Sequence, residues 1–258
     1  MLGNTTSAAY TVHHDNLYVF GGYQKPACGV RPGVQIFYSA TNSWSWSTKH
    51  DPPLELGAFQ CAVTAGDLIF VIGGWYPWDH YPSASTCKEE LSSSEIREVN
   101  QEFKYYQDRV QIYDTKKQSL TGEHIWYQGP PLITRRRKHG CSLIKMSGSY
   151  GIMVVGGANS HDKELTSVEY LELGSDLNKI AINNLRWSPM GRMKSSRKKN
   201  PVVLDGRDHV YVIGGNSGTD SIERFDKKNQ QWKDLGYGTK IKRTDSAFVK
   251  VPKTSSIC

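Results

Sequence analysis

The chain has 258 residues, of which 38% are hydrophobic and 22% charged, and its formal net charge is +7. This composition is ordinary for a folded chain and argues against intrinsic disorder. The longest apolar runs, such as 68–72 and 152–155, have strand length and fall far short of the roughly 20 residues of a membrane-spanning helix. The first ten residues lack the basic and apolar segments of a secretory signal, so we expect a cytoplasmic location.

Four apolar runs that each end in a pair of glycines divide the chain into repeats. The first glycines of the pairs lie 52, 83 and 58 residues apart, which indicates a period near 50 broken by one long insertion. The runs predict strands over 17–20, 68–72, 152–155 and 210–213. A shorter apolar stretch precedes each run, so each glycine pair ends the second strand of its repeat.

A third strand and a tryptophan follow each glycine pair. The third strands are expected at 34–37, 110–113, 168–171 and 222–225. The tryptophans that open the fourth strands are Trp44 or Trp46, Trp126, Trp187 and Trp232. Large aromatic side chains at a fixed place in every repeat are typical of packing between neighbouring units, so we interpret them as core and not as a ligand site.

Four short strands per unit, with Gly-Gly after the second and Trp in the fourth, resemble the kelch repeat. This resemblance covers nearly the whole chain and implies an all-β fold, a kelch-type β-propeller of four-stranded antiparallel blades. The four blades are expected at about 8–54, 57–133, 138–192 and 198–238, with part of a fifth at 244–252. Four blades and one strand fit either a small closed ring or an arc of a larger one, and we favour the arc.

The second repeat contains an insertion over 75–109, between its second and third strands. Its first part is rich in aromatic residues and interrupted by proline, which predicts irregular structure. Ser92 and Glu95 form a capping-box pattern, and an apolar stripe with helical period follows, so a helix is predicted over about 93–105. The insertion is either a decorated loop that folds back on the blade rim or a recognition element.

The positive charge is concentrated in three clusters. These are Arg135, Arg136, Arg137 and Lys138; then Arg192, Lys194, Arg197, Lys198 and Lys199; and finally Lys240, Lys242 and Arg243. Their twelve charges exceed the net charge of the chain, so the rest of the chain is net negative. All three clusters fall in links from the outer strand of one blade to the inner strand of the next. Because antiparallel strands reverse at each turn, these links and the insertion are expected on one face.

The resemblance extends to kelch domains of BTB-kelch ubiquitin-ligase adaptors, in which side chains on these links hold an acidic peptide. It implies a non-enzymatic protein-binding module for an acidic or phosphorylated segment. It also implies cullin-ligase components as partners, through BTB and BACK domains that this chain does not contain. The matching positions are Arg137, Lys138, Lys198, Lys199, Lys242 and Arg243, with Tyr23, Trp75, Tyr76, Asn159 and Asn216 just past the glycine pairs.

Patterns typical of catalysis or metal binding are missing from the sequence. The eight histidines form no i, i+2 or i, i+4 ligand pair, and His13-His14 is interpreted as a plain surface pair. The five cysteines are scattered and odd in number, so free thiols are expected, with Cys61 and Cys141 as small buried residues. We therefore expect no cofactor and no metal.

Two other function classes stay open at this stage. A carbohydrate-active kelch enzyme, such as a sialic acid epimerase, would need only Arg and Glu around a channel. However, Glu169 and Glu223 lie in the middle of predicted strands, where a structural role is favoured. The basic runs are also compatible with binding to a nucleic acid or an anionic membrane, but we expect neither of them to be the partner. Short basic runs of this kind are compatible with nuclear import as well.

Overall fold

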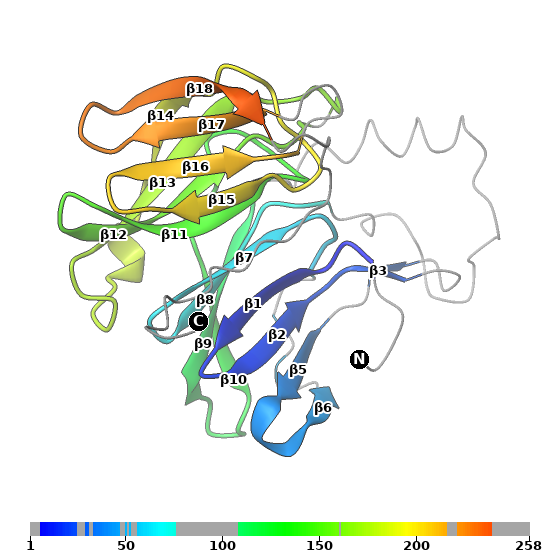
Figure 1. The fold of residues 1–258 in the computed structure, drawn as a ribbon. Coiled ribbons are helices and arrows are strands. Elements are labelled where there is room, and N and C mark those ends of the chain that lie inside the picture. The colour runs from blue at the N-terminus through cyan, green and yellow to red at the C-terminus, as the bar shows by residue number, and fades with distance from the viewer. Residues whose placement is uncertain are drawn as a thin grey trace, which may run out of the picture.

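In the computed structural model, the described part of the chain forms four antiparallel sheets of four strands, arranged side by side as propeller blades (Figure 1). The structure describes residues 6–24, 29–30, 33–46, 50, 52, 56–75, 108–159, 161–215 and 221–238. Helical structure in these residues includes two short 3-10 turns, η1 (Ser39–Thr41) and η4 (Ile182–Asn184). None of the described helices is long and apolar enough to cross a membrane.

Each blade runs from an inner to an outer strand. Blade 1 consists of β1 (Ala9–His13), β2 (Asn16–Phe20), β5 (Val34–Tyr38) and β6 (Ser43–Trp46). Blade 2 consists of β7 (Cys61–Ala65), β8 (Leu68–Ile72), β9 (Val110–Gln118) and β10 (His124–Gln128). Blade 3 consists of β11 (Gly140–Met146), β12 (Ser149–Val155), β13 (Ser167–Gly174) and β14 (Trp187–Arg192). Blade 4 consists of β15 (Val202–Asp205), β16 (His209–Ile213), β17 (Ser221–Asp226) and β18 (Gln231–Gly238).

The observed strands confirm the predicted repeat. The second strands β2, β8, β12 and β16 coincide with the four apolar runs before the glycine pairs. A small extra hairpin, β3 (Tyr23–Gln24) with β4 (Gly29–Val30), occupies the connection between β2 and β5. The predicted helix over 93–105 and the predicted strand over 244–252 lie outside the described residues.

The hydrophobic core of the four described blades is divided into three layers, one between each pair of neighbouring blades. One layer joins blades 1 and 2, the next joins blades 2 and 3, and the third joins blades 3 and 4. Both faces of β8 are covered, and all five of its side chains are buried. A blade therefore cannot bury its apolar surface alone, which is why the repeat has to be stacked.

The repeated tryptophans connect each blade to the one before it. The indole N–H of Trp126 donates to the carbonyl of His50, and that of Trp232 donates to the carbonyl of Met190. Trp187 makes the equivalent bond to Pro130. These bonds satisfy the indole N–H while the rings fill the layers between blades, which agrees with a structural role.

The glycine pairs allow close approach of the neighbouring link. Gly156 has a φ of 62°, and a Cβ built there would lie 2.4 Å from the carbonyl oxygen of Arg197. The next residue, Gly157, donates its N–H to that oxygen at 2.6 Å. Gly21 repeats the arrangement in blade 1, where a Cβ would lie 2.3 Å from the oxygen of Gly57. Only glycine combines this backbone conformation with this proximity.

The inner strands contact one another in the order β1, β7, β11 and β15. Cys61 on β7 and Cys141 on β11 form a disulfide, so the expectation of two free thiols was wrong. Inner strands of neighbouring blades converge towards the axis, which brings the two Cα atoms to 6.2 Å although 80 residues separate them. No spacing motif marks such a pair in the sequence.

Candidate binding surface

One end of the propeller, here called the link face, carries the connections into the inner strands and the segments that follow the glycine pairs. The N–H groups of Gly22 and Gly74 donate to the carbonyls of Gly57 and Arg136, which belong to the links that enter the next blade. Gly157 does the same with the following link. The two sets of connections therefore meet at one end, as strand reversal predicted.

A chain of backbone hydrogen bonds crosses the link face from blade to blade. The N–H of Phe59 donates to the carbonyl of Ser7, that of Lys138 to Phe59, and that of Asn200 to Lys138. Each of the four residues stands two positions before its inner strand and has a φ between 54° and 59°. Four non-glycine residues in the left-handed region are unusual, and such strain is often found at functional surfaces.

Side chains from two of these positions form an aromatic and basic patch. The ammonium group of Lys138 lies 4.8 Å from the centre of the Phe59 ring, within the range of a cation–π interaction. The Trp75 ring lies 6.4 Å from the Phe59 ring, and the backbone of Trp75 pairs with that of Ala58. All three side chains are partly exposed. The patch can therefore contact both an apolar group and an anion.

Beside this patch, two of the basic residues predicted to bind a partner contact the same carboxylate. Asp162 accepts hydrogen bonds from Arg137 at 3.2 Å and from Lys198 at 3.3 Å. Lys198 also pairs with Glu164, at 3.6 Å. Burial by itself would raise the pKa of Asp162, but the Lys198 bond and the charges of Arg137, Lys198 and Lys138 together lower it. Asp162 therefore stays ionised and holds Arg137 and Lys198 in position.

Two members of the basic clusters are not on the surface at all. The side chains of Arg136 and Arg197 are fully buried, which corrects their assignment to an exposed basic face. Arg136 pairs with Glu169 and donates to the carbonyls of Gly156 and Ser167. Arg197 pairs with Glu223.

The physical role of these buried Arg–Glu pairs is to provide hydrogen-bond partners for backbone groups at strand ends and in the links between blades. The carboxylate of Glu169 also accepts from the backbone N–H groups of Ile133 and Thr134, at 2.7 and 2.9 Å. Glu223 binds Lys194 and Ser195 in the same way, at 2.6 and 2.9 Å. Both carboxylates are therefore structural, as their mid-strand position indicated.

The remaining predicted site residues fall into three groups. Asn159 accepts the N–H groups of His161 and Lys163 and shapes its own loop. Lys199 is partly exposed and has a φ of 67°, in the link that also carries Lys198. The third group lies outside the described residues and consists of Tyr76, Asn216, Lys242 and Arg243, together with Tyr23, of which only the backbone is described.

Sequence reasoning missed Phe59, Asp162 and Glu164. Phe59 stands two residues before its inner strand, as Lys138 does, so aligning the links between repeats could have found it. Asp162 and Glu164 follow the third glycine pair, but their charge was counted only as part of the acidic remainder. No sequence signal showed that they face Arg137 and Lys198.

Comparison with known proteins agrees with this architecture. A family model described as Kelch motif matches residues 206–237, which contain β16, β17 and most of β18. No curated protein matches the chain. Among solved structures, the one described as "Structure of YjhT" is similar with a TM-score of 0.66 and 16% identity, over 91% of this chain and 72% of that one. The chain therefore folds as a kelch-type β-propeller, and the structure describes four of its four-stranded antiparallel blades.

Proposed function

We propose that the chain is a non-enzymatic interaction module that binds an acidic segment of a partner protein on its link face. The observation that carries the proposal is the shared contact of Arg137 and Lys198 with Asp162. Asp162 is about half exposed, with a side-chain accessibility of 51%. A carboxylate from a partner could take its place between the same two cations.

The charge balance favours an anionic partner. Arg137, Lys138 and Lys198 act on Asp162, and Lys198 also pairs with Glu164, so three positive charges face two carboxylates. Complementary charge of this kind raises association rates and selects partners more than it raises affinity. The aromatic rings of Phe59 and Trp75 add an apolar contact beside it, which would help to define the register of a bound peptide.

A role as the substrate-recognition part of a cullin-type ubiquitin ligase adaptor is a finer form of the same proposal. It rests on the kelch resemblance and on the basic link face. It predicts that the captured partner becomes ubiquitinated in cells that express the protein.

The binding surface can be tested with a fluorescent polyglutamate peptide and anisotropy. Lys138→Glu should weaken binding at least 10-fold, a loss of about 1.4 kcal/mol, because it reverses a charge beside the Phe59 ring. Asp162→Asn should do the opposite and tighten binding several-fold, because it removes the internal competitor for Arg137 and Lys198. Both effects should shrink as salt is raised, since exposed charges are screened over about 8 Å at physiological ionic strength.

Lys228→Glu is the matched control. Lys228 is exposed in the turn between β17 and β18, a type of turn that strand reversal places at the other end of the propeller. The proposal fails if this variant weakens peptide binding as much as Lys138→Glu, because attraction would then follow net charge alone. It also fails if Asp162→Asn weakens binding.

A further inference from the structure

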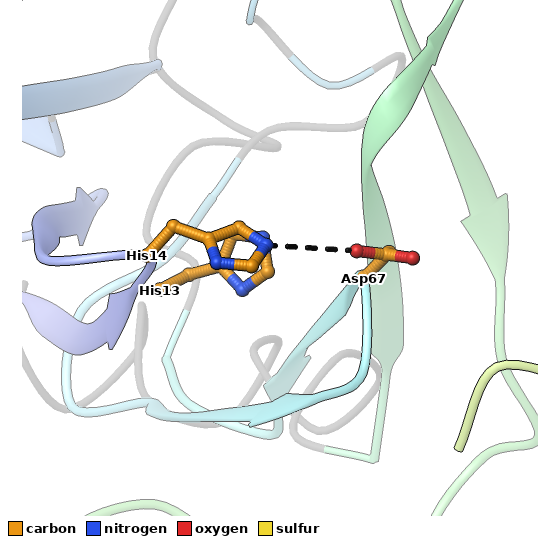
Figure 2. A group of neighbouring side chains, drawn as sticks. All are labelled: His13, His14 and Asp67. Atoms are coloured by element: carbon orange, nitrogen blue, oxygen red, sulfur yellow. Dashed lines mark ion pairs between the residues drawn. The ribbon is translucent and has the colours of Figure 1, made fainter. Parts of the chain in front are cut away.

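Two hairpin turns meet at the opposite end of blades 1 and 2. His13 ends β1, and His14 with Asp15 forms the two-residue turn into β2, with φ angles of 44° and 63°. Asp67 occupies the corresponding turn between β7 and β8. The left-handed turn brings the two imidazole rings to 4.0 Å, so neighbours in sequence point to the same side. Figure 2 shows both rings facing Asp67.

We propose that His13, His14 and Asp67 bind a divalent zinc ion. One potential ligand atom from each residue lies within 4.8 Å of the others, and Nε2 of His14 is 3.9 Å from Oδ1 of Asp67. Tetrahedral zinc with bonds of about 2.0–2.2 Å needs ligand atoms about 3.3 Å apart. The ligand atoms therefore have to move slightly closer together to surround the ion, and the His14 side chain, which is 74% exposed, has room for this movement.

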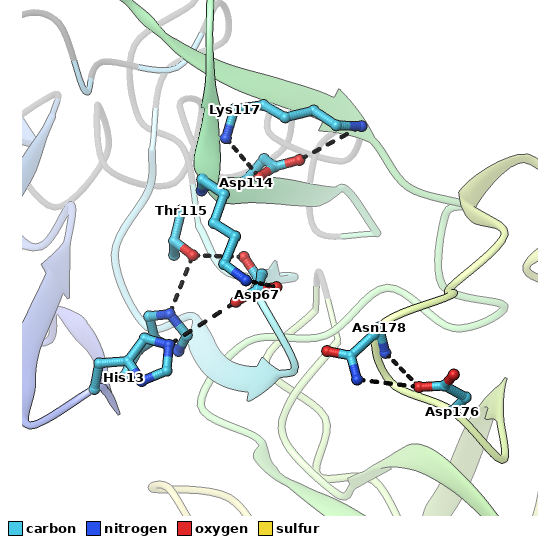
Figure 3. Close-up of polar contacts among 9 residues, drawn as sticks. His13, Asp67, Asp114, Thr115, Lys117, Asp176 and Asn178 are labelled. Carbon is cyan, nitrogen blue, oxygen red and sulfur yellow. Dashed lines mark hydrogen bonds and ion pairs between the residues drawn. The ribbon is translucent and has the colours of Figure 1, made fainter.

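The surroundings of His13 are compatible with the tautomer that a metal requires. The hydroxyl of Thr115 donates its only proton to the carbonyl of Asp67, at 2.8 Å. The same hydroxyl is 3.1 Å from Nε2 of His13 and, while it donates to that carbonyl, can accept a hydrogen bond from that nitrogen (Figure 3). Nδ1 of His13 then keeps its lone pair. Histidines that bind metals characteristically donate their other N–H to such a partner.

Asp67 is also held in a suitable way. Its Oδ2 pairs with Lys116 at 2.8 Å, while Oδ1 faces His14, so the carboxylate would bind zinc through one oxygen. Two imidazoles and a carboxylate are a ligand set that favours zinc over magnesium or calcium. With three protein ligands, the fourth position is left to water. The ion would join the turns of blades 1 and 2, at the end of the propeller away from the link face.

Zinc binding to the purified, EDTA-treated chain can be measured by competition with a zinc indicator. His14→Asn is the main variant, because asparagine tolerates the left-handed backbone of this exposed position. We expect it to weaken zinc binding at least 10-fold, and Asp67→Asn to do the same. Thr115→Val should weaken binding by about 10–100-fold through loss of the bond to His13. Magnesium should not compete.

His161→Asn, which removes an exposed histidine at the link face, is the matched control and should leave zinc affinity unchanged. At a zinc concentration about 100 times Kd, the melting temperature of the unsubstituted chain should rise by about 5–10 °C, and that of His14→Asn should not. The proposal is overturned if His14→Asn and Asp67→Asn bind zinc as tightly as the unsubstituted chain, or if none of the proteins binds it.

Discussion

Replacing Glu169 by glutamine tests whether the buried ion pairs hold the blades together. The substitution keeps the size of the side chain and removes its charge. Its carboxylate is 2% exposed and accepts from Arg136 and from two backbone N–H groups. In Glu169→Gln, the amide nitrogen has to face at least one of these donors. Arg136 is fully buried, and among the described residues Glu169 is the only carboxylate that pairs with it, so the substitution removes its anionic partner.

The size of the effect follows from these contacts. A hydrogen bond to a charged group contributes about 1.5–3 kcal/mol and a neutral one about 0.5–1.5, so neutralising Glu169 costs about 1 kcal/mol for each of three bonds. Breaking a buried ion pair by removing one partner costs about 3–5 kcal/mol. The first route gives about 3 kcal/mol and the second about 3–5, so Glu169→Gln should lower the free energy of unfolding by about 3–5 kcal/mol. For a chain of this size the melting temperature should fall by about 6–20 °C.

Urea unfolding followed by tryptophan fluorescence measures this loss, because Trp187 packs in the layer beside Glu169. Glu172→Gln is the control: it makes the same chemical change on the same strand, β13, at an exposed position. It should change stability by less than about 0.5 kcal/mol. A loss below about 1 kcal/mol for Glu169→Gln, or equal losses for both variants, would refute the structural role assigned to the pair.

Three further predictions concern the described blades. Peptide mapping without reductant should recover a Cys61–Cys141 cross-linked peptide, and reduction should cost about 4.5 kcal/mol of stability for a loop of 80 residues. His139 is buried, and burial first and the charge of Arg136 second lower its pKa from 6.5 to about 3. Between about pH 6.5 and pH 3, His139 is therefore protonated in the unfolded chain but neutral in the folded chain, so the free energy of unfolding falls as the pH drops below about 6.5. His139→Gln should reduce that slope by about 1.4 kcal/mol per pH unit. Gly156→Ala should destabilise the chain strongly, because its Cβ would lie 2.4 Å from a carbonyl oxygen, whereas Gly148→Ala meets nothing within 4 Å and should cost far less in calorimetry.

The amino-acid sequence by itself determined the blade architecture. Apolar runs of strand length, glycine pairs and tryptophans recur in the same order, and each of these signals is local in the chain. The reversal of direction at every antiparallel turn also determined which links share a face. The position of Glu169 and Glu223 within their strands is also a local signal, and it indicated their structural role before any contact was known.

Only the tertiary structure decided which charged and polar side chains meet. Arg136 and Arg137 are neighbours in a basic run, yet one is buried against Glu169 and the other pairs with Asp162 at the surface. Likewise, the partners Cys61 and Cys141 belong to different blades. Strand periodicity specifies which side of its own sheet a residue occupies. It does not specify what the next blade places opposite, because that depends on how whole sheets stack around the axis.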